Sequence, residues 1–242
     1  MTIQTVDRPK QTPQPAQQTE PPPLNSGDHL SRAEFERRYT AHPEIKKAEL
    51  IEGVVYVSSP IRYAKHADPH FDIIAWLGAY RAATPGVKGG DNATLRLDLE
   101  NEPQPDALLR LEPEVGGQSF VSADDYLEGI PELIVEISAS SASYDLYEKR
   151  RVYARNSVPE YLVIQTYEQR VDWFVLRENG YESLEPDENG LLRSEIFPGL
   201  WLQPAALWSA DLTTLLDTLQ EGLATPEHTT FVEQLRARRQ EK

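Results

Sequence analysis

The chain has no cysteine among its 242 residues. This absence excludes disulfides, thiolate nucleophiles and cysteine-ligated zinc, and it agrees with a cytoplasmic location. No apolar run approaches the roughly 20 residues that a membrane-spanning helix needs. The N-terminal sequence MTIQTVDR also lacks the charged-then-apolar layout of a secretory signal. We therefore expect a cytoplasmic protein with no membrane partner.

Positive charge is also scarce, because 24 Lys and Arg residues face 39 Asp and Glu residues, for a net charge of −15. Nucleic acids are bound chiefly through Lys and Arg, so this balance argues against a nucleic-acid partner. The sum hides local patterns, however, and a carboxylate cluster loaded with Mg²⁺ reverses its own local sign. Seven basic residues are candidates for one positively charged face: Arg62, Lys65, Lys88, Lys149, Arg150, Arg151 and Arg155.

The length predicts one domain with tails. Residues 1–27 are rich in Gln, Thr and Pro and nearly devoid of apolar side chains, which predicts a disordered tail. We expect the folded domain to span 28–210. Residues 211–242 are expected to form a C-terminal helical extension whose basic end frays.

Local patterns predict the elements of an α/β domain. Ser31 and Glu34 have the spacing of a capping box, so a first helix should run to about His42. Apolar residues at intervals of three and four predict a long amphipathic helix over 63–83. Further strands are expected at 49–57 (two, joined near Glu52-Gly53), 93–99, 105–111, 133–137 and 161–164, with a helix at 144–155. A hairpin is expected from strands at 171–176 and 181–184, which flank the turn residues Glu178-Asn179-Gly180. The expected architecture is a mixed central β-sheet flanked by helices.

Two carboxylates in strand-like segments indicate the chemistry. Asp106 follows Pro105, which blocks a helix, and Glu136 interrupts an apolar run that favours a buried strand. A buried carboxylate needs a partner, and Mg²⁺ is typically held by one or two carboxylates, water and phosphate oxygens. Lys149 supplies a point charge for the attacking water or the scissile phosphate. The pattern predicts a metal-dependent phosphodiesterase site.

Each residue also has a plainer interpretation. Glu136 can be a buried carboxylate satisfied by the main chain or an arginine, although its burial without a metal is costly. Asp106 can be turn chemistry alone. Asp145 and Lys149 have the spacing of a surface ion pair. Against that pairing, Lys149 lies one or two turns into the helix that follows the Glu136 strand, so it can reach back over the strand end.

Other residues give weaker signals. His66 is a candidate general base, a phosphate contact or a polar residue on a helix face. The position of Tyr153, one turn beyond Lys149 on the same face of the helix, favours a packing role over that of an acid. The remaining histidines show no metal-ligand spacing with one another: His29, His42, His70 and His228.

A family resemblance unites these segments. The chain resembles the PD-(D/E)XK, restriction-endonuclease-like superfamily, and more closely its Uma-two family of endonucleases, from about Ser31 to Leu207. The likeness is carried by these segments: Glu49-Leu50-Ile51-Glu52-Gly53, His66, Pro105-Asp106, Pro131-Glu132-Leu133-Ile134-Val135-Glu136-Ile137-Ser138, Asp145, Lys149, Tyr153 and Val158-Pro159-Glu160-Tyr161. Two departures are Ser157, where glycine is usual, and the segment 161–165, which lacks the usual tryptophan and aspartate.

The resemblance implies roles. Asp106 and Glu136 would be ligands of Mg²⁺ or Mn²⁺. Lys149 would be the catalytic lysine, moved onto the following helix because Ser138 occupies its usual place. Glu49 would add a carboxylate, and His66, Ser138 and Tyr153 are possible accessory residues.

The expected function is a divalent-metal-dependent endonuclease that hydrolyses DNA. Cutting two strands calls for two sites, which favours a homodimer. Two other interpretations stay open. The acidic balance favours a catalytically silent nuclease fold that binds or regulates a protein partner, and the same chemistry would suit a hydrolase of small phosphorylated substrates.

Overall fold

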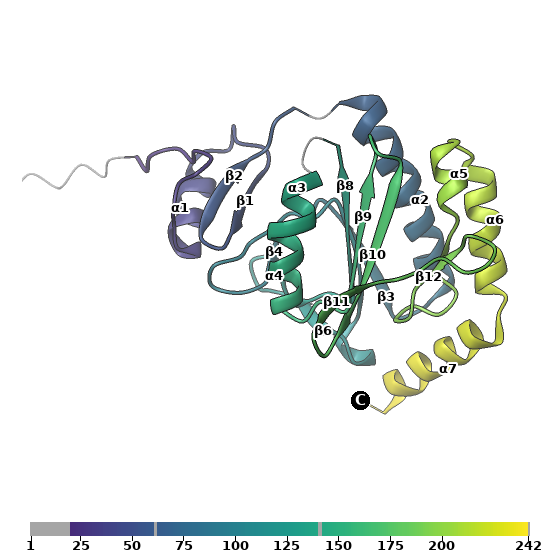
Figure 1. Cartoon of the computed structure of the whole chain (residues 1–242). Helices are drawn as coiled ribbons and strands as arrows, with labels where there is room; N and C mark the ends of the chain where they lie inside the picture. Colours follow the sequence, from purple (N-terminus) through teal and green to yellow (C-terminus); the bar gives the residue numbers. More distant parts are fainter. Residues whose placement is uncertain (1–19, 61, 140–141, 242) are drawn as a thin grey trace, which may run out of the picture.

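The computed structural model describes residues 20–60, 62–139 and 142–241. A six-stranded sheet forms its centre (Figure 1). In order across the sheet, the strands are β11 (Gly180–Ser183), β10 (Arg170–Arg177), β9 (Glu160–Gln165), β8 (Leu133–Ser138), β5 (Ala107–Leu111) and β3 (Val87–Asp91). Only β8 and β9 pair in parallel; the other neighbours are antiparallel. The expected mixed sheet is confirmed.

The two parallel strands are buried along their whole length. Strands covered on both faces read as nearly continuous apolar runs, which explains the sequences of β8 and β9. Successive side chains point to opposite faces of a strand. Val135 and Ile137 accordingly join one core cluster, whereas Ile134 joins another.

Helices cover both faces of the sheet. The face of Val135 packs against α2 (Asp68–Ala83) and α6 (Leu212–Leu223), through residues such as Trp76 and Leu219. The opposite face carries α3 (Ala142–Tyr144), a π-helical turn η3 (Asp145–Lys149) and α4 (Arg150–Arg155). Figure 1 shows α2 and α6 on one side of the sheet and α3 and α4 on the other. The π-helical turn η1 (Tyr63–Ala67) leads into α2, so the predicted helix over 63–83 is continuous but not regular throughout.

The N-terminal unit lies beside the sheet and has its own small core. It consists of α1 (Arg32–Ala41) and the hairpin of β1 (Ala48–Ile51) and β2 (Val54–Val57), packed around Phe35 and Leu50. Ser31 Oγ accepts the Glu34 N–H, which confirms the predicted helix cap. Leu50 pairs with Glu102 in an isolated antiparallel bridge, which joins the hairpin to the body of the protein.

Smaller elements complete the fold. β4 (Leu95–Arg96), β7 (Leu127–Ile130) and β6 (Gln118–Val121) form a three-stranded sheet. The strand expected over 93–99 is therefore shorter than predicted, because only two of its residues pair with β7. The remaining elements are η2 (Pro113–Val115), β12 (Leu192–Arg193), β13 (Trp201–Leu202), α5 (Pro204–Trp208) and α7 (Pro226–Gln240).

Contacts of the described residues cross both predicted domain boundaries. Of the predicted tail, residues 1–19 lie outside the described residues, but Leu24 is buried in the N-terminal core and the Gly27 N–H donates to the Val55 carbonyl. At the other end, Leu215 and Leu235 belong to the main core, so α6 and α7 are part of the domain. α7 continues to Gln240 and Arg238 donates to the Val115 carbonyl, while the fraying of the basic end stays a prediction.

No helix within the described residues is both long enough and apolar enough to span a membrane.

Candidate active site

Asp106 and Glu136 lie side by side because of the register of two strands. β5 runs antiparallel to β8 with Ala107 opposite Val135, so one further step brings Asp106 to Glu136. Asp106 Oδ2 accepts the Ile137 N–H at 2.8 Å, which holds the carboxylate against the main chain of β8. Both carboxyl groups are buried. The structure therefore brings together the two carboxylates that sequence reasoning paired.

Lys149 reaches Glu136 from the following helical segment. Its Nζ lies 2.8 Å from Glu136 Oε1 and 2.9 Å from Glu49 Oε1. The contact to Asp145 Oδ1 is longer, at 3.7 Å. Only 3% of the lysine side chain is exposed. Asp145 and Lys149 therefore do not form a simple surface ion pair, because both residues belong to a buried cluster of charged side chains.

The accessory candidates Glu49, Ser138 and Tyr153 all contact this cluster. Besides its contact with Lys149, Glu49 Oε1 accepts the Gln104 N–H at 2.7 Å. The Tyr153 hydroxyl donates to Glu136 Oε1 at 3.0 Å, so this residue does more than pack. Ser138 Oγ donates to Asp145 Oδ2 at 2.5 Å. Ser138 thus orients Asp145, whereas Tyr153 donates a hydrogen bond directly to Glu136.

Histidines from the η1–α2 segment approach Asp106 from its other side. His66 Nε2 lies 3.2 Å from Asp106 Oδ2. His66 Nδ1 is buried and has no hydrogen-bond partner among the described residues. His70, which showed no metal spacing in the sequence, lies with Nε2 2.8 Å from the Asp106 carbonyl oxygen. His66 therefore belongs to the site, and His70 supports its main chain.

Sequence reasoning missed Lys47 and Asn92. Lys47 Nζ lies 3.0 Å from Asp106 Oδ1 and 3.0 Å from Asn92 Oδ1. The available signal was the two-residue spacing of Lys47 and Glu49, because alternate residues of an extended segment point the same way. That signal becomes useful only once the hairpin is known to pack against the site.

The charges in the site do not balance. When all four carboxyl groups are ionised, they exceed the two lysine ammonium groups by two charges: Asp106, Glu136, Glu49 and Asp145 against Lys47 and Lys149. Burial raises the pKa of Glu136 to about 8, and the carboxylates of Asp106 and Asp145 add to the rise while Lys149 opposes it. An added positive charge would therefore be electrostatically favourable in this site.

Asp106 and Lys149 respond differently to the same surroundings. Burial alone would raise the pKa of Asp106, but the hydrogen bond with His66 and the charge of Lys47 hold it below its ordinary value. Burial would lower the pKa of Lys149, but Glu136, Glu49 and Asp145 hold it well above its ordinary value. Asp106 and Lys149 thus stay charged, and Glu136 is the group that gains most from an added cation.

The donor set fits a divalent ion. Both hydrogen bonds that Glu136 accepts from the described residues end on Oε1, which leaves Oε2 for a ligand bond. No group of three or more His, Asp and Glu residues suited to a metal occurs in the described parts of the chain. An ion here would therefore have two protein carboxylates and several water or phosphate oxygens, as Mg²⁺ prefers.

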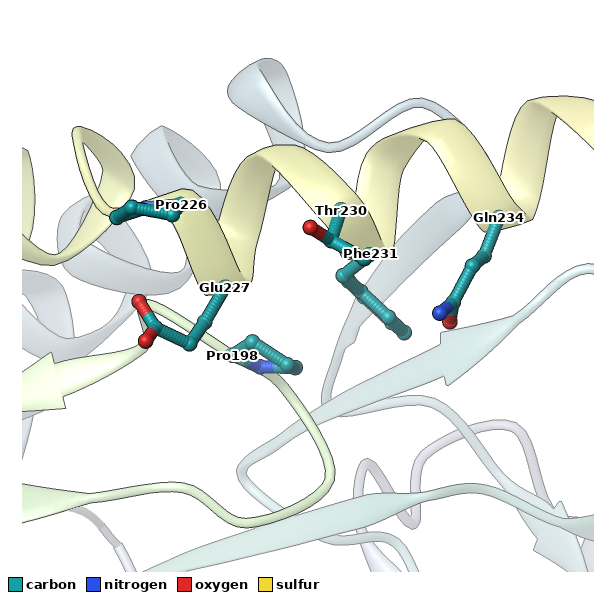
Figure 2. Close-up of a pocket in the computed structure, with 6 residues that line it drawn as sticks. All are labelled: Pro198, Pro226, Glu227, Thr230, Phe231 and Gln234. Carbon is teal, nitrogen blue, oxygen red and sulfur yellow. The ribbon is translucent and has the colours of Figure 1, made fainter.

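Two pockets lie away from the carboxylate cluster. One of about 370 Å³ opens between α7 and the loop at Pro198 (Figure 2). Another of about 610 Å³ lies between β10 and α5, beside Asp172 and Trp208. Neither contains a residue of the carboxylate cluster.

Comparisons with known proteins show the family and the fold. The family model Uma2, described as "Putative restriction endonuclease", matches residues 32–205. A crystal structure described as "a putative nuclease belonging to DUF820 from Anabaena variabilis ATCC 29413" superposes with a TM-score of 0.51 at 13% sequence identity, covering 67% of this chain and 89% of that chain. This likeness confirms the restriction-endonuclease-like fold. No curated protein matches the chain.

Proposed function

Because the chain belongs to the Uma2 family of restriction-endonuclease-like proteins, we propose that it is a divalent-metal-dependent endonuclease that hydrolyses phosphodiester bonds in DNA. One observation carries the proposal: Asp106 and Glu136 meet on adjacent strands, and Lys149 lies 2.8 Å from Glu136. A purely structural ion pair needs no second pair of carboxylates around it. A phosphodiesterase needs this excess of negative charge to hold a cation.

The proposed ligands are Asp106 Oδ1 and Glu136 Oε2, and the ion is Mg²⁺ or Mn²⁺. When bound, such an ion polarises a phosphoryl oxygen and lowers the pKa of a bound water. Asp106 is held in place by the Ile137 N–H, and Glu136 by the Tyr153 hydroxyl. The protein therefore presents both oxygens in a fixed geometry, as preorganised catalysis requires.

Lys149 supplies a fixed positive charge beside the ligands. Glu49 and Glu136 hold its ammonium group within 2.9 Å on two sides. We propose that it orients the attacking water or neutralises charge on the phosphate in the transition state. Loss of Lys149 should therefore reduce turnover more than it reduces metal binding.

His66 is the proposed contact for a water or a phosphate oxygen. Its Nε2 faces Asp106, and its buried Nδ1 has no protein partner among the described residues. A buried polar atom without a partner is costly, so a substrate or water oxygen at Nδ1 would relieve that cost. A homodimer that cuts both strands stays a prediction, as does DNA rather than RNA as the substrate.

The test is cleavage of supercoiled plasmid in millimolar Mg²⁺ or Mn²⁺ by protein free of contaminating nuclease. Asp106→Ala, Glu136→Ala and Lys149→Ala should each abolish cleavage, because a methyl group replaces neither a ligand nor the fixed charge. The control is Glu178→Ala, which removes an exposed carboxylate far along the chain in the β10–β11 turn. Wild-type activity in Glu136→Ala would refute the assignment.

The net charge of −15 supports a second candidate, a nuclease fold that binds a protein partner without cleaving DNA. This candidate predicts no divalent-dependent cleavage by the wild type. It also predicts that Glu136→Ala changes neither partner binding nor metal response. The plasmid assay with the same variants separates the two functions.

A further inference from the structure

Lys47 is the second lysine of the site, and it stands at the solvent edge. It immediately precedes β1, and its carbonyl accepts the Ser58 N–H, which closes the open end of the hairpin. Its side chain is 20% exposed, compared with 3% for Lys149. One lysine is thus enclosed by carboxylates, whereas the other has a route to water.

Lys47 occupies the one oxygen of Asp106 that an ion can use without disturbing the sheet. Asp106 Oδ2 already accepts the Ile137 N–H and faces His66. Oδ1 is bonded to Lys47 Nζ at 3.0 Å. A Mg²⁺–oxygen bond is only about 2.1 Å long, so an ammonium group on the same oxygen would lie within a few ångströms of the ion and be strongly repelled.

We propose that Lys47 is an exchangeable counter-ion, which neutralises Asp106 and is displaced from Oδ1 when a divalent ion binds. This inference rests on the proposed metal site of Asp106 and Glu136. The four-carbon stem and partial exposure let the ammonium group move outward without a change in the main chain. Asn92 Oδ1, also 3.0 Å from Lys47 Nζ, is a neutral acceptor and is not one of the proposed ligands of the divalent ion.

Two consequences follow from displacement. Lys47 competes with the ion for Asp106, so removal of its charge should tighten metal binding. The released ammonium group would also become accessible to solvent, at the mouth of the site where a substrate phosphate approaches. Lys47 would then link metal loading to the N-terminal hairpin that carries it.

The first experiment is a calorimetric titration of Mn²⁺ into the full chain as wild type, Lys47→Met and Lys46→Met. Lys46 is a matched control, because it is the exposed neighbour of Lys47 and its Nζ donates to the Pro43 carbonyl instead of a carboxylate. We expect Lys47→Met to bind Mn²⁺ about tenfold more tightly than the wild type, since a close positive charge is removed. Lys46→Met should stay within about twofold, because an exposed and distant charge is screened.

The second experiment uses the wild type alone, so it decides the question even if Lys47→Met does not fold. Lysines are acetylated briefly with acetic anhydride, with and without saturating Mn²⁺, and each site is quantified by mass spectrometry. Displacement predicts that acetylation of Lys47 rises at least about fivefold with Mn²⁺, because the amine loses its carboxylate partner. Lys46 should be labelled equally in both conditions, and Lys149 should stay protected.

The outcomes separate this inference from the proposed function. If the wild type binds Mn²⁺ but Lys47→Met binds it no more tightly, or Lys47 labelling does not respond to Mn²⁺, displacement is refuted and the metal site stands. Tighter binding without a labelling response indicates repulsion at a distance, which also refutes displacement. If the wild type binds no Mn²⁺, both the proposed metal site and the proposed displacement of Lys47 are refuted.

Discussion

Two buried glutamates on neighbouring parallel strands show how differently one side chain is used. Glu136 on β8 accepts hydrogen bonds from Lys149 and Tyr153 and lies among other carboxylates. Glu160 on β9 accepts four hydrogen bonds from neutral donors: the N–H groups of Glu195 and Ile196, Trp173 Nε1 and Ser194 Oγ. Burial alone therefore does not identify a functional carboxylate.

The nature of the donors explains the difference. Burial raises the pKa of Glu160 to about 7, against the hydrogen bonds from Ser194 and the main chain. Each of these contacts donates to the carboxylate, so the ionised form satisfies all four hydrogen bonds. Glu160 fastens the loop at Ser194 to the sheet. Glu136 instead lies in a cluster with excess negative charge, which is a condition that a divalent ion corrects.

The largest expected effect is the loss of stability in Glu160→Ala. This change leaves four donors without an acceptor, two of them buried and two part-buried, so we expect a decrease in the free energy of unfolding of about 3–5 kcal/mol. Glu136→Ala should cost less than about 2 kcal/mol, because Lys149 keeps Glu49 and Asp145 while a repulsive carboxylate is removed. Urea unfolding of both variants measures this, and equal losses would remove the distinction between the two glutamates.

The second prediction concerns the thermal response to Mn²⁺. An ion that binds only the folded state at 100 times its dissociation constant stabilises it by about 2.7 kcal/mol, which raises the melting temperature by several degrees. We expect this shift in the wild type and its loss in Glu136→Gln. Glu160→Gln, although less stable, should keep it, because Glu160 has no part in the site. A flat response in the wild type would contradict the metal site.

Local patterns in the sequence were enough to predict the central pair. Alternation within 133–137 places Glu136 on the face of Ile134, and the strand order then brings Asp106 to it. Helical spacing also predicted the Asp145–Lys149 contact. It did not show that this contact is buried, because burial depends on Glu49 arriving from the N-terminal hairpin.

What sequence reasoning missed arises from contacts between distant segments. Lys47 meets Asp106 across 59 positions in the chain, and Glu160 meets the loop at Ser194 across 34. No periodicity encodes such contacts, because they are created when separate elements pack together. The same reason accounts for the packing of α6 against α2 and of α7 against η2.

The last prediction concerns the pH dependence of stability that arises from a third buried carboxylate, Glu102. Glu102 has neither the four neutral hydrogen-bond donors of Glu160 nor the lysine partner of Glu136. Burial raises the pKa of Glu102 to about 8, and the neighbouring carboxyl group of Glu36 adds to the rise. The pKa is therefore higher in the folded protein than in the unfolded chain. Glu102 then favours folding at low pH, and stability falls as the pH rises from about 4.5 to about 8.

Glu102→Gln should remove this dependence, because an amide does not titrate. We expect the free energy of unfolding, measured in urea, to fall more in the wild type than in Glu102→Gln between about pH 5 and pH 8. Glu100→Gln, which alters an exposed carboxylate two residues away, should follow the wild type. Mn²⁺ should leave the difference between these two variants unchanged, because Glu102 lies outside the proposed ligand set. A dependence on Mn²⁺ would mean that buried carboxylates near the N-terminal unit share the ion, and the contrast between structural and functional carboxylates would have to be redrawn around Glu102.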